Sequence, residues 1–300
     1  MKKRIALTLL ASGLMGLNAA AQTIGTVITN APGDAVQLDE PYGVAVVADQ
    51  MFITDGVNGR VVQYDSNLGK KTVLNDEFFD PRGIVAARGG LVVADAGYNS
   101  IRLLNTNGSS VLLAGSDVTS MEGGSGLVDG NGTSVRFNSP AGLAVGNAGD
   151  IFIADQLNNA IRKLDLAGNV TTVVSNLFKP AAVAYDGAGG RLFIADTENH
   201  TILVLTNGAA APVLYAGGGS NVKFGTTDGI GTNARFLKPA GLLWVGGKTG
   251  LLVSDTGNAL IRQIYETTAG VPTVVAFASS ASAGLVKPMG SFHQCQWSFP

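Results

Sequence analysis

The sequence predicts an all-β fold of the β-propeller class, with five recognisable blades and a partial sixth. One observation is a pattern of proline, apolar strand, turn and second strand that recurs five times, in units of about 40 residues. The other is composition, with 41 glycines among 300 residues and only 14% charged residues. This composition favours short strands joined by tight turns. Four short strands in about 40 residues suit a propeller blade.

Each unit begins at a proline, and its second strand ends in an aspartate. The prolines are Pro41, Pro81, Pro140, Pro180 and Pro239. The aspartates are Asp55, Asp95, Asp155, Asp196 and Asp255. Six residues after each aspartate, a β-branched residue opens a third strand. The predicted blade cores are therefore 41–80, 81–139, 140–179, 180–238 and 239–287.

The second and fourth units are longer, because the prolines are spaced by 40, 59, 40 and 59 residues. Their extra residues share a motif, Asp129-Gly-Asn-Gly-Thr-Ser-Val-Arg-Phe137 and Asp228-Gly-Ile-Gly-Thr-Asn-Ala-Arg-Phe236. Such a close match predicts folded structural inserts and not linkers. Aspartate and threonine oxygens also suit calcium, but the loops lack the further carboxylates of strong sites. No cofactor is assigned, and calcium remains an open alternative.

The first residues have the layout of a secretory signal peptide. A basic start at Lys2–Arg4 precedes an apolar run from Ile5 to Leu17 and three alanines before Gln22. The apolar run is shorter than the roughly 20 residues that span a bilayer. We therefore expect residues 1–21 to be removed, residues 22–300 to form the propeller, and the protein to be secreted or periplasmic. No membrane span is expected after residue 21.

The two ends of the mature chain are expected to share the closing blade. Residues 23–30 can supply an outer strand and residues 288–300 an inner one, although the tail from Ser291 departs from the repeat. Removal of the signal peptide leaves 17 basic against 22 acidic residues. This mildly acidic balance predicts no nucleic-acid partner. Cys295 is the single cysteine, which excludes a disulfide within the chain.

The repeated segments resemble the NHL repeat, whose pattern is Pro-x-Gly, an apolar strand, Asp-x-x-Asn and Ile-Arg. The segments Asp196-Thr-Glu-Asn-His-Thr-Ile202 and Asp255-Thr-Gly-Asn-Ala-Leu-Ile-Arg262 are the most similar. The inserts resemble those of bacterial NHL proteins. The resemblance covers nearly all of residues 22–300, with departures at Ala182, which replaces the glycine, and Tyr98, which replaces the asparagine. It implies a ring of blades that acts as a binding or interaction module.

The recurrent charged residues are predicted to be structural. At the end of a strand, an aspartate can accept hydrogen bonds from backbone N–H groups of the turn, and a ring places the five on separate blades. Recurrent arginines at 102, 162 and 262 are expected to pair with neighbouring polar groups. No catalytic residue or metal ligand is assigned, since two histidines cannot make a histidine-rich zinc centre. The predicted binding residues are exposed-looking turn residues: Tyr98, Asn159, Glu198 and His200.

The predicted function is an exported propeller that binds a protein, peptide or carbohydrate ligand through one face of the disc. Two alternatives stay open. One is an enzyme of the lactonase or lyase type, which this fold resembles, with a divalent metal in the central channel. The other is a structural protein of the cell envelope. Similarity of fold alone does not choose among them.

Overall fold

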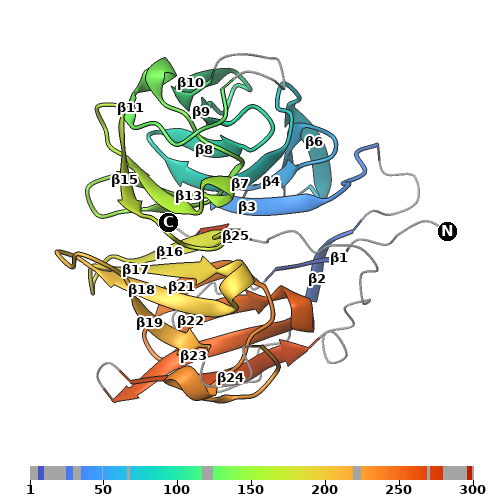
Figure 1. Ribbon diagram of the computed structural model, residues 1–300. Coiled ribbons are helices and arrows are strands. Elements are labelled where there is room, and N and C mark those ends of the chain that lie inside the picture. Colours follow the sequence, from blue (N-terminus) through green and yellow to red (C-terminus); the bar gives the residue numbers. More distant parts are fainter. Residues whose placement is uncertain are drawn as a thin grey trace.

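The computed structural model describes residues 6–9, 25–29, 35–48, 50–65, 68–116, 124–218, 224–268, 271–279 and 296–298. Five antiparallel sheets are arranged about a common centre (Figure 1). Each sheet contains four consecutive strands of the chain, so each predicted repeat forms one blade. The all-β fold and the five predicted blades are confirmed.

The bounds of the blades follow the repeat. Blade 1 contains β3 (Pro41–Val47), β4 (Gln50–Asp55), β5 (Arg60–Asp65) and β6 (Lys70–Asn75). Blade 2 contains β7 (Pro81–Ala87), β8 (Gly90–Asp95), β9 (Ser100–Leu104) and β10 (Ser110–Gly115). Blade 3 contains β12 (Pro140–Val145), β13 (Ile151–Asp155), β14 (Ala160–Leu164) and β15 (Asn169–Val174). Blade 4 contains β16 (Ala182–Asp186), β17 (Arg191–Asp196), β18 (Thr201–Thr206) and β19 (Val213–Gly217). Blade 5 contains β21 (Pro239–Gly246), β22 (Gly250–Asp255), β23 (Leu260–Thr268) and β24 (Val271–Ser279).

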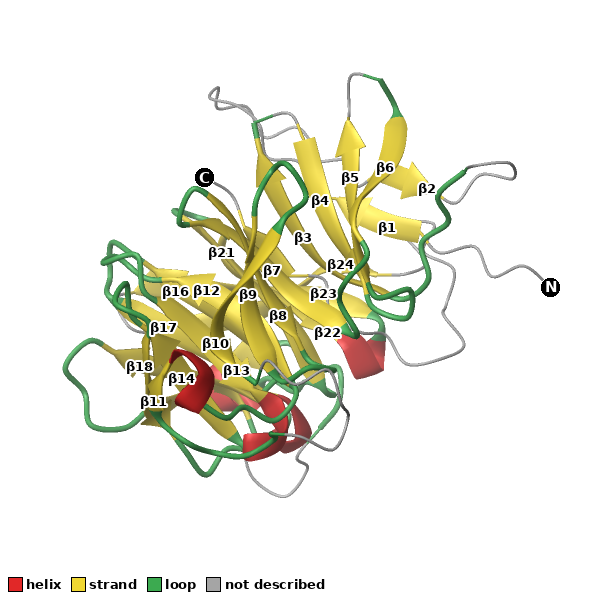
Figure 2. Ribbon diagram, turned by 90° about the horizontal axis from the view of Figure 1, so that it is seen from above, coloured by secondary structure: helices red, strands yellow, loops and turns green. Residues whose placement is uncertain are grey.

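In the described parts of the chain, the helices are single 3-10 turns. They are η1 (Gly132–Ser134), η2 (Gln156–Asn158), η3 (Thr197–Asn199), η4 (Gly231–Asn233) and η5 (Thr256–Asn258). Figure 2 shows these helices along one side of the molecule. Within the described ranges, none is long and apolar enough to cross a membrane.

The first strands of neighbouring blades pack against each other around the centre, in chain order. Glycine permits this close approach. A Cβ added to Gly83 would lie 2.2 Å from the carbonyl oxygen of Ala141, and one added to Gly43 would lie 2.5 Å from that of Arg82. The glycine of the Pro-x-Gly pattern is thus required because the next blade's backbone occupies the space of a side chain.

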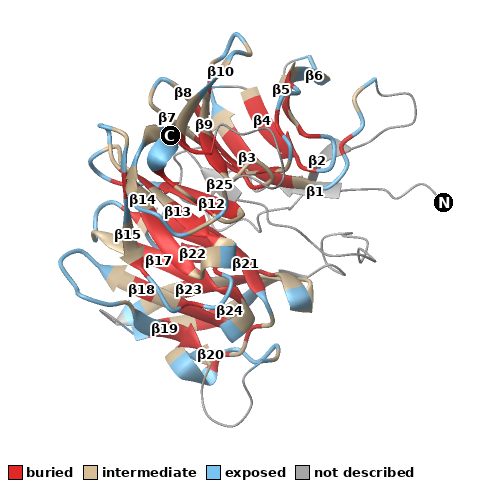
Figure 3. Cartoon of the chain, turned by 45° about the horizontal axis from the view of Figure 1, so that its top comes forward, coloured by how far each residue is buried: buried red, intermediate tan, exposed pale blue. Residues whose placement is uncertain are grey.

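The core consists of apolar layers between successive blades (Figure 3). Side chains alternate along each strand, so every blade presents one apolar face to each neighbour. In blade 2, Leu91 and Val93 face blade 1, whereas Val92 and Ala94 face blade 3. Phe137, which is fully buried, completes the layer between blades 2 and 3. The aromatic residue of each insert therefore belongs to the core.

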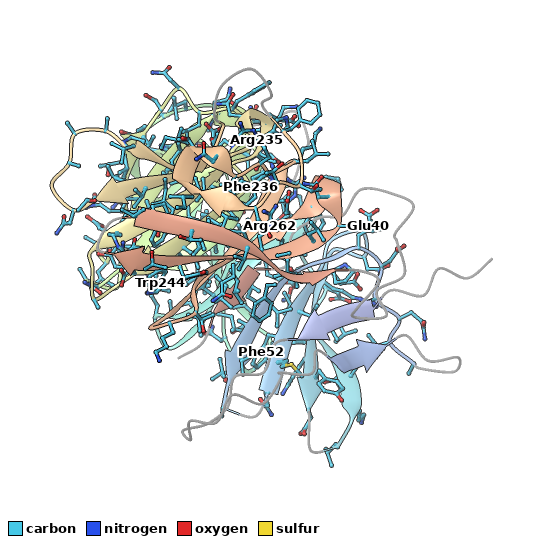
Figure 4. The ribbon with its side chains drawn as sticks, turned by 90° about the horizontal axis from the view of Figure 1, so that it is seen from below. Glu40, Phe52, Arg235, Phe236, Trp244 and Arg262 are labelled. Atoms are coloured by element: carbon cyan, nitrogen blue, oxygen red, sulfur yellow. The ribbon has the colours of Figure 1, made fainter. Side chains whose placement is uncertain are left out.

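Blade 1 carries one apolar layer without a neighbouring blade. It includes Val44, Met51, Ile53 and Val62, and its other members come from the same blade and from the residues leading into it. On this side, β1 (Ala6–Leu9) and β2 (Gly25–Thr29) form a two-stranded sheet between blades 1 and 5 (Figures 1 and 4). Among the described residues, no sixth four-stranded sheet is present.

The segments expected to share a closing blade pair with other partners. The strand β2, which lies within 23–30, pairs with β1. The strand β25 (Gln296–Ser298) runs parallel to Gly43–Ala45 of β3, at the centre of the disc. Most of residues 280–300 lie outside the described residues, so the partial closing blade stays a prediction.

Both inserts add a short strand to the outer edge of the blade that follows. β11 (Gly130–Asn131) pairs with β15 of blade 3, and β20 (Gly229–Ile230) pairs with β24 of blade 5. Each is followed by a 3-10 turn. The described parts of the inserts are thus folded, as their matched sequences predict.

Candidate functional site

One face of the disc carries two sets of loops, and we call it the turn face. It contains the turns after the second strand of each blade and the loops before the first strand. They lie together because the strands are antiparallel, so that Pro41 is paired with Asp55 and Pro140 with Asp155. Three of the short helices form part of these turns. All four predicted binding residues lie on this face.

The repeated aspartates fasten the turn of each blade to the loop before it. All five are buried. The Oδ1 atom of Asp155 accepts the N–H of Asn138 at 2.7 Å, and that of Asp196 accepts the N–H of Phe178 at 2.6 Å. Their Oδ2 atoms each accept a side-chain amide three residues on, at 2.8 Å. These bonds are the structural role that the sequence predicts.

Two buried arginines tie the inserts to the following blades. The Nη1 of Arg162 donates to Asp155 at 2.8 Å, and its Nη2 donates to Asp129 at 2.7 Å. Its guanidinium lies 5.2 Å from the ring centre of Phe137. Arg262 repeats this arrangement with three partners: Asp255 at 3.1 Å, Asp228 at 2.6 Å and the ring of Phe236 at 5.3 Å (Figure 4). The third recurrent arginine, Arg102, donates to the Oγ of Ser110.

The insert aspartates also hold the outer strand of the next blade. Asp129 accepts the N–H of Thr172 at 3.0 Å and its hydroxyl at 2.8 Å, while Asp228 accepts the N–H of Ala276 at 3.2 Å. Burial opposes ionisation of Asp129, but the hydrogen bonds from Thr172 and Arg162 outweigh it and lower its pKa. Across the described parts of the chain, no three His, Cys, Asp or Glu side chains are grouped to hold a metal ion.

Two of the predicted binding residues connect neighbouring blades. Asn159 and His200 adopt left-handed backbone conformations, with φ of 55° and 59°. The Oδ1 of Asn159 accepts the N–H of Lys179 at 2.8 Å, and the Nδ1 of His200 accepts the N–H of Lys238 at 3.1 Å. Each accepted N–H lies directly before the proline that starts the next blade. Asn159 and His200 therefore contribute to the ring itself.

The other two predicted residues pack against neighbours on the same face. The ring of Tyr98 lies 5.6 Å from that of Phe79, and Glu198 pairs with the ammonium of Lys238 at 3.1 Å. Glu198 and His200 share one turn, whereas Tyr98 belongs to blade 2. All four predicted residues are half-buried and not fully exposed. Their binding role stays a prediction.

Sequence reasoning missed a polar group at the centre of the turn face, Tyr42, Asp80, Arg82 and Gln156, which we call the mouth cluster. Arg82 donates from Nε to Oδ2 of Asp80 at 3.0 Å and from Nη1 to Oε1 of Gln156 at 2.9 Å. Its Nη2 forms an ion pair with the same Oδ2 at 2.8 Å. Its guanidinium lies 5.4 Å from the ring centre of Tyr42. Burial raises the pKa of the Tyr42 hydroxyl. The cluster joins blades 1, 2 and 3.

A signal for this cluster is present in the sequence. The residue after the starting proline is alanine in three blades, at 141, 181 and 240, but tyrosine and arginine in the first two. This departure from a small residue marks positions 42 and 82.

Exposed aromatic side chains also gather on the turn face. Among the described residues, the phenylalanines more than a third exposed are Phe79 at 45%, Phe178 at 48% and Phe224 at 54%. Phe79 and Phe178 lie in the loops before blades 2 and 4, and Phe224 lies beside His200, with ring centres 5.5 Å apart. The apolar Val57 and Leu157 are exposed on turns of the same face.

Comparison with known sequences identifies similarity to one repeat family. A model of the NHL repeat matches residues 179–205. The chain is 30% identical over 225 residues to the Arabidopsis thaliana chloroplastic protein SUPPRESSOR OF QUENCHING 1, a match that covers 65% of this chain and 21% of that protein. It is 36% identical over 87 residues to NHL repeat-containing protein 2 of Gallus gallus, covering 29% and 11%. The matches thus span about a fifth and a tenth of these longer relatives.

Solved structures show the same fold at low sequence identity. The chain in a crystal structure of a nidogen–laminin complex aligns with a TM-score of 0.56 at 14% identity, covering 75% of each chain. A gluconolactonase of Xanthomonas campestris aligns with a TM-score of 0.59 at 18% identity, covering 80% of this chain and 76% of that one. The two proteins have different roles, so these similarities indicate the fold alone.

Proposed function

Because this chain is an NHL-repeat β-propeller, we propose that it acts as an interaction module that binds a protein partner through its turn face. The main support for this proposal is that the exposed phenylalanines lie together on that face. Aromatic side chains are enriched at protein interfaces, because they bury large areas with little loss of conformational freedom. A group of exposed apolar side chains on one face is a common mark of an interaction site.

The remaining residue pattern supports binding over catalysis. The recurrent aspartates and arginines are buried and hydrogen-bonded to the chain's own backbone and side chains. Their positions are thus explained by the construction of the blades. The exposed phenylalanines have no such explanation, because a side chain exposed on a loop contributes little to the core.

We place the partner outside the cytoplasm, since residues 1–21 have the layout of a signal peptide. Occurrence of the same fold in a nidogen–laminin complex is in keeping with a protein partner. The residue pairs that we expect at the contact are Phe79 with Tyr98 and Phe224 with His200, because each pair forms a joint surface.

Site-specific photo-crosslinking in the producing cell tests this proposal. A photoreactive phenylalanine analogue replaces Phe79 or Phe178, and a matched variant carries it at Leu166, which is 67% exposed in a turn on the opposite face. We expect crosslinked protein from positions 79 and 178 but not from position 166. Equal crosslinking at all three positions, or none at 79 and 178, would show that the turn face is not the interface.

A further inference from the structure

From the geometry of the mouth cluster we infer that the partner presents an extended peptide segment, held there through its main chain. This inference rests on the proposed protein-binding function and specifies the part of the partner that is recognised. The segment would lie across the turns of blades 1 to 4, with apolar side chains placed on the exposed residues beside the cluster.

The mouth cluster has one donor and one acceptor that are not used within the described structure. A guanidinium can only donate, so the atom of Gln156 that faces Arg82 must be Oε1. The Nε2 amide of Gln156 is then directed elsewhere. Arg82 contacts Oδ2 of Asp80, which leaves Oδ1 as an acceptor among the described contacts. A peptide unit offers one N–H and one C=O, which matches this pair.

Packing holds the cluster in a fixed geometry. A Cβ added to Gly56 would lie 2.6 Å from the ring of Tyr42 and 3.1 Å from Oδ1 of Asp80. The turn of blade 1 therefore lies directly against the cluster. The Tyr42 ring in turn supports the Arg82 guanidinium. A site fixed in this way loses little conformational freedom when a ligand binds.

Exposed apolar residues adjoin the cluster in the sequence. Val57 follows Gly56, Phe79 precedes Asp80, and Leu157 follows Gln156, and all three are exposed. Polar groups at the centre are therefore flanked by apolar side chains on three blades. An extended peptide combines main-chain polar groups with side chains that alternate in direction. It can satisfy both parts of this surface at once.

Charge on the turn face also varies from blade to blade. Asp39 is exposed before blade 1, whereas Lys179 is exposed before blade 4. A peptide with a basic end over blade 1 and an acidic end over blade 4 would complement this distribution. Such complementarity fixes the direction of a bound segment.

The structure contains an extended segment beside the mouth cluster. Residues 296–298 form β25, which is paired in parallel with β3 next to Tyr42. The central edge of blade 1 therefore accepts a strand through main-chain hydrogen bonds, a common mode of peptide recognition. A carbohydrate has no equivalent to these bonds. This observation favours a peptide over a carbohydrate.

A peptide library of random segments of about twelve residues, displayed on phage and selected on the full chain, tests the inference. Binding of selected peptides is then measured by fluorescence polarisation. The variant Gln156→Glu keeps the acceptor for Arg82 but removes the free N–H, and Asp80→Asn replaces the free acceptor with a donor. We expect each to weaken binding by about tenfold, as for the loss of one hydrogen bond. Gln50→Glu, the same change on the opposite face, is the control and should have no effect.

The outcomes separate this inference from the proposed function. If Phe79→Ser and Phe178→Ser abolish peptide binding while Gln156→Glu and Asp80→Asn leave it unchanged, the turn face binds protein but the main-chain recognition is wrong. If no peptide is selected and a glycan array gives binding that depends on Gln156, the ligand is a carbohydrate and the inference fails. Melting temperatures equal to that of the unchanged protein confirm that each variant is folded.

Discussion

Replacing Asp155 by alanine is expected to destabilise the protein more than the equivalent change in blade 4. Asp155 is fully buried and accepts three hydrogen bonds, from the N–H of Asn138, the amide of Asn158 and the guanidinium of Arg162. Removing one partner of a buried ion pair costs about 3–5 kcal/mol when the other charge is left unpaired. Arg162 keeps Asp129 as a second partner, so we expect the lower end of this range. Asp196 has the same backbone and amide bonds, but no arginine partner among the described contacts, because Leu203 stands where blade 3 has Arg162. Its loss should cost about 1–3 kcal/mol.

The assay is equilibrium unfolding in urea of the unchanged protein, Asp155→Ala, Asp196→Ala and the double variant Asp155→Ala with Arg162→Met. The double variant removes the charge that Asp155→Ala leaves behind, so it should recover part of the lost stability. If Asp155→Ala costs no more than Asp196→Ala, the ion pair between Asp155 and Arg162 does not stabilise the protein, and this reasoning is refuted. A double variant less stable than Asp155→Ala would show instead that Arg162 stabilises the fold mainly through its bond to Asp129.

Three further predictions concern the ring. Gly83→Ala should destabilise the folded protein by about 1–3 kcal/mol, since the added Cβ would lie 2.2 Å from the Ala141 carbonyl oxygen. Thermal unfolding measures this change, and an unchanged melting temperature would contradict the prediction. His200→Asn should be tolerated, because Asn159 serves the same role in the left-handed conformation, whereas His200→Val should lower the melting temperature. Burial raises the pKa of Asp196 in the folded protein above its value in the unfolded chain, about 3.9. The folded state therefore binds the proton more tightly, so the stabilisation by protonated Asp196 is fully present below about pH 3.9 and is lost as pH rises through the folded pKa. Relative to Asp196→Asn, the stability of the unchanged protein should therefore fall with rising pH over the acid range, and a pH-independent difference would contradict this.

The blades could be predicted because the residues that mark them recur at regular spacings in the sequence. A proline and an aspartate recur at fixed intervals, and five occurrences of one pattern leave little room for another fold. The structural role of the aspartates follows from the same repetition. A residue that occurs at the same position in every blade is more simply explained by a role in folding each blade than by a role in one binding site. Both conclusions use local spacing and need no knowledge of the three-dimensional arrangement.

The mouth cluster could not be predicted in the same way. Arg82 and Gln156 are 74 residues apart and meet only because blades 2 and 3 are neighbours in the ring. The roles of Asn159 and His200 likewise depend on where the next blade places its N–H group. Sequence placed these two side chains on a turn, but the packing of blades decided what they contact. The pairing of β2 and β25 also depends on where the chain ends lie in space.

The two ion pairs that hold the inserts, Arg162 with Asp129 and Arg262 with Asp228, have a mechanical consequence. Arg162 fastens blade 3 to the insert that follows blade 2, and Arg262 does the same for blades 4 and 5. Blades 1 and 2, and blades 3 and 4, are joined without an insert of this kind. The disc is therefore a series of stiff and compliant joints in alternation. Thermal motion should bend it more at the joints between blades 1 and 2 and between blades 3 and 4 than at the two joints that carry an insert, and amide exchange of the facing strands measures this.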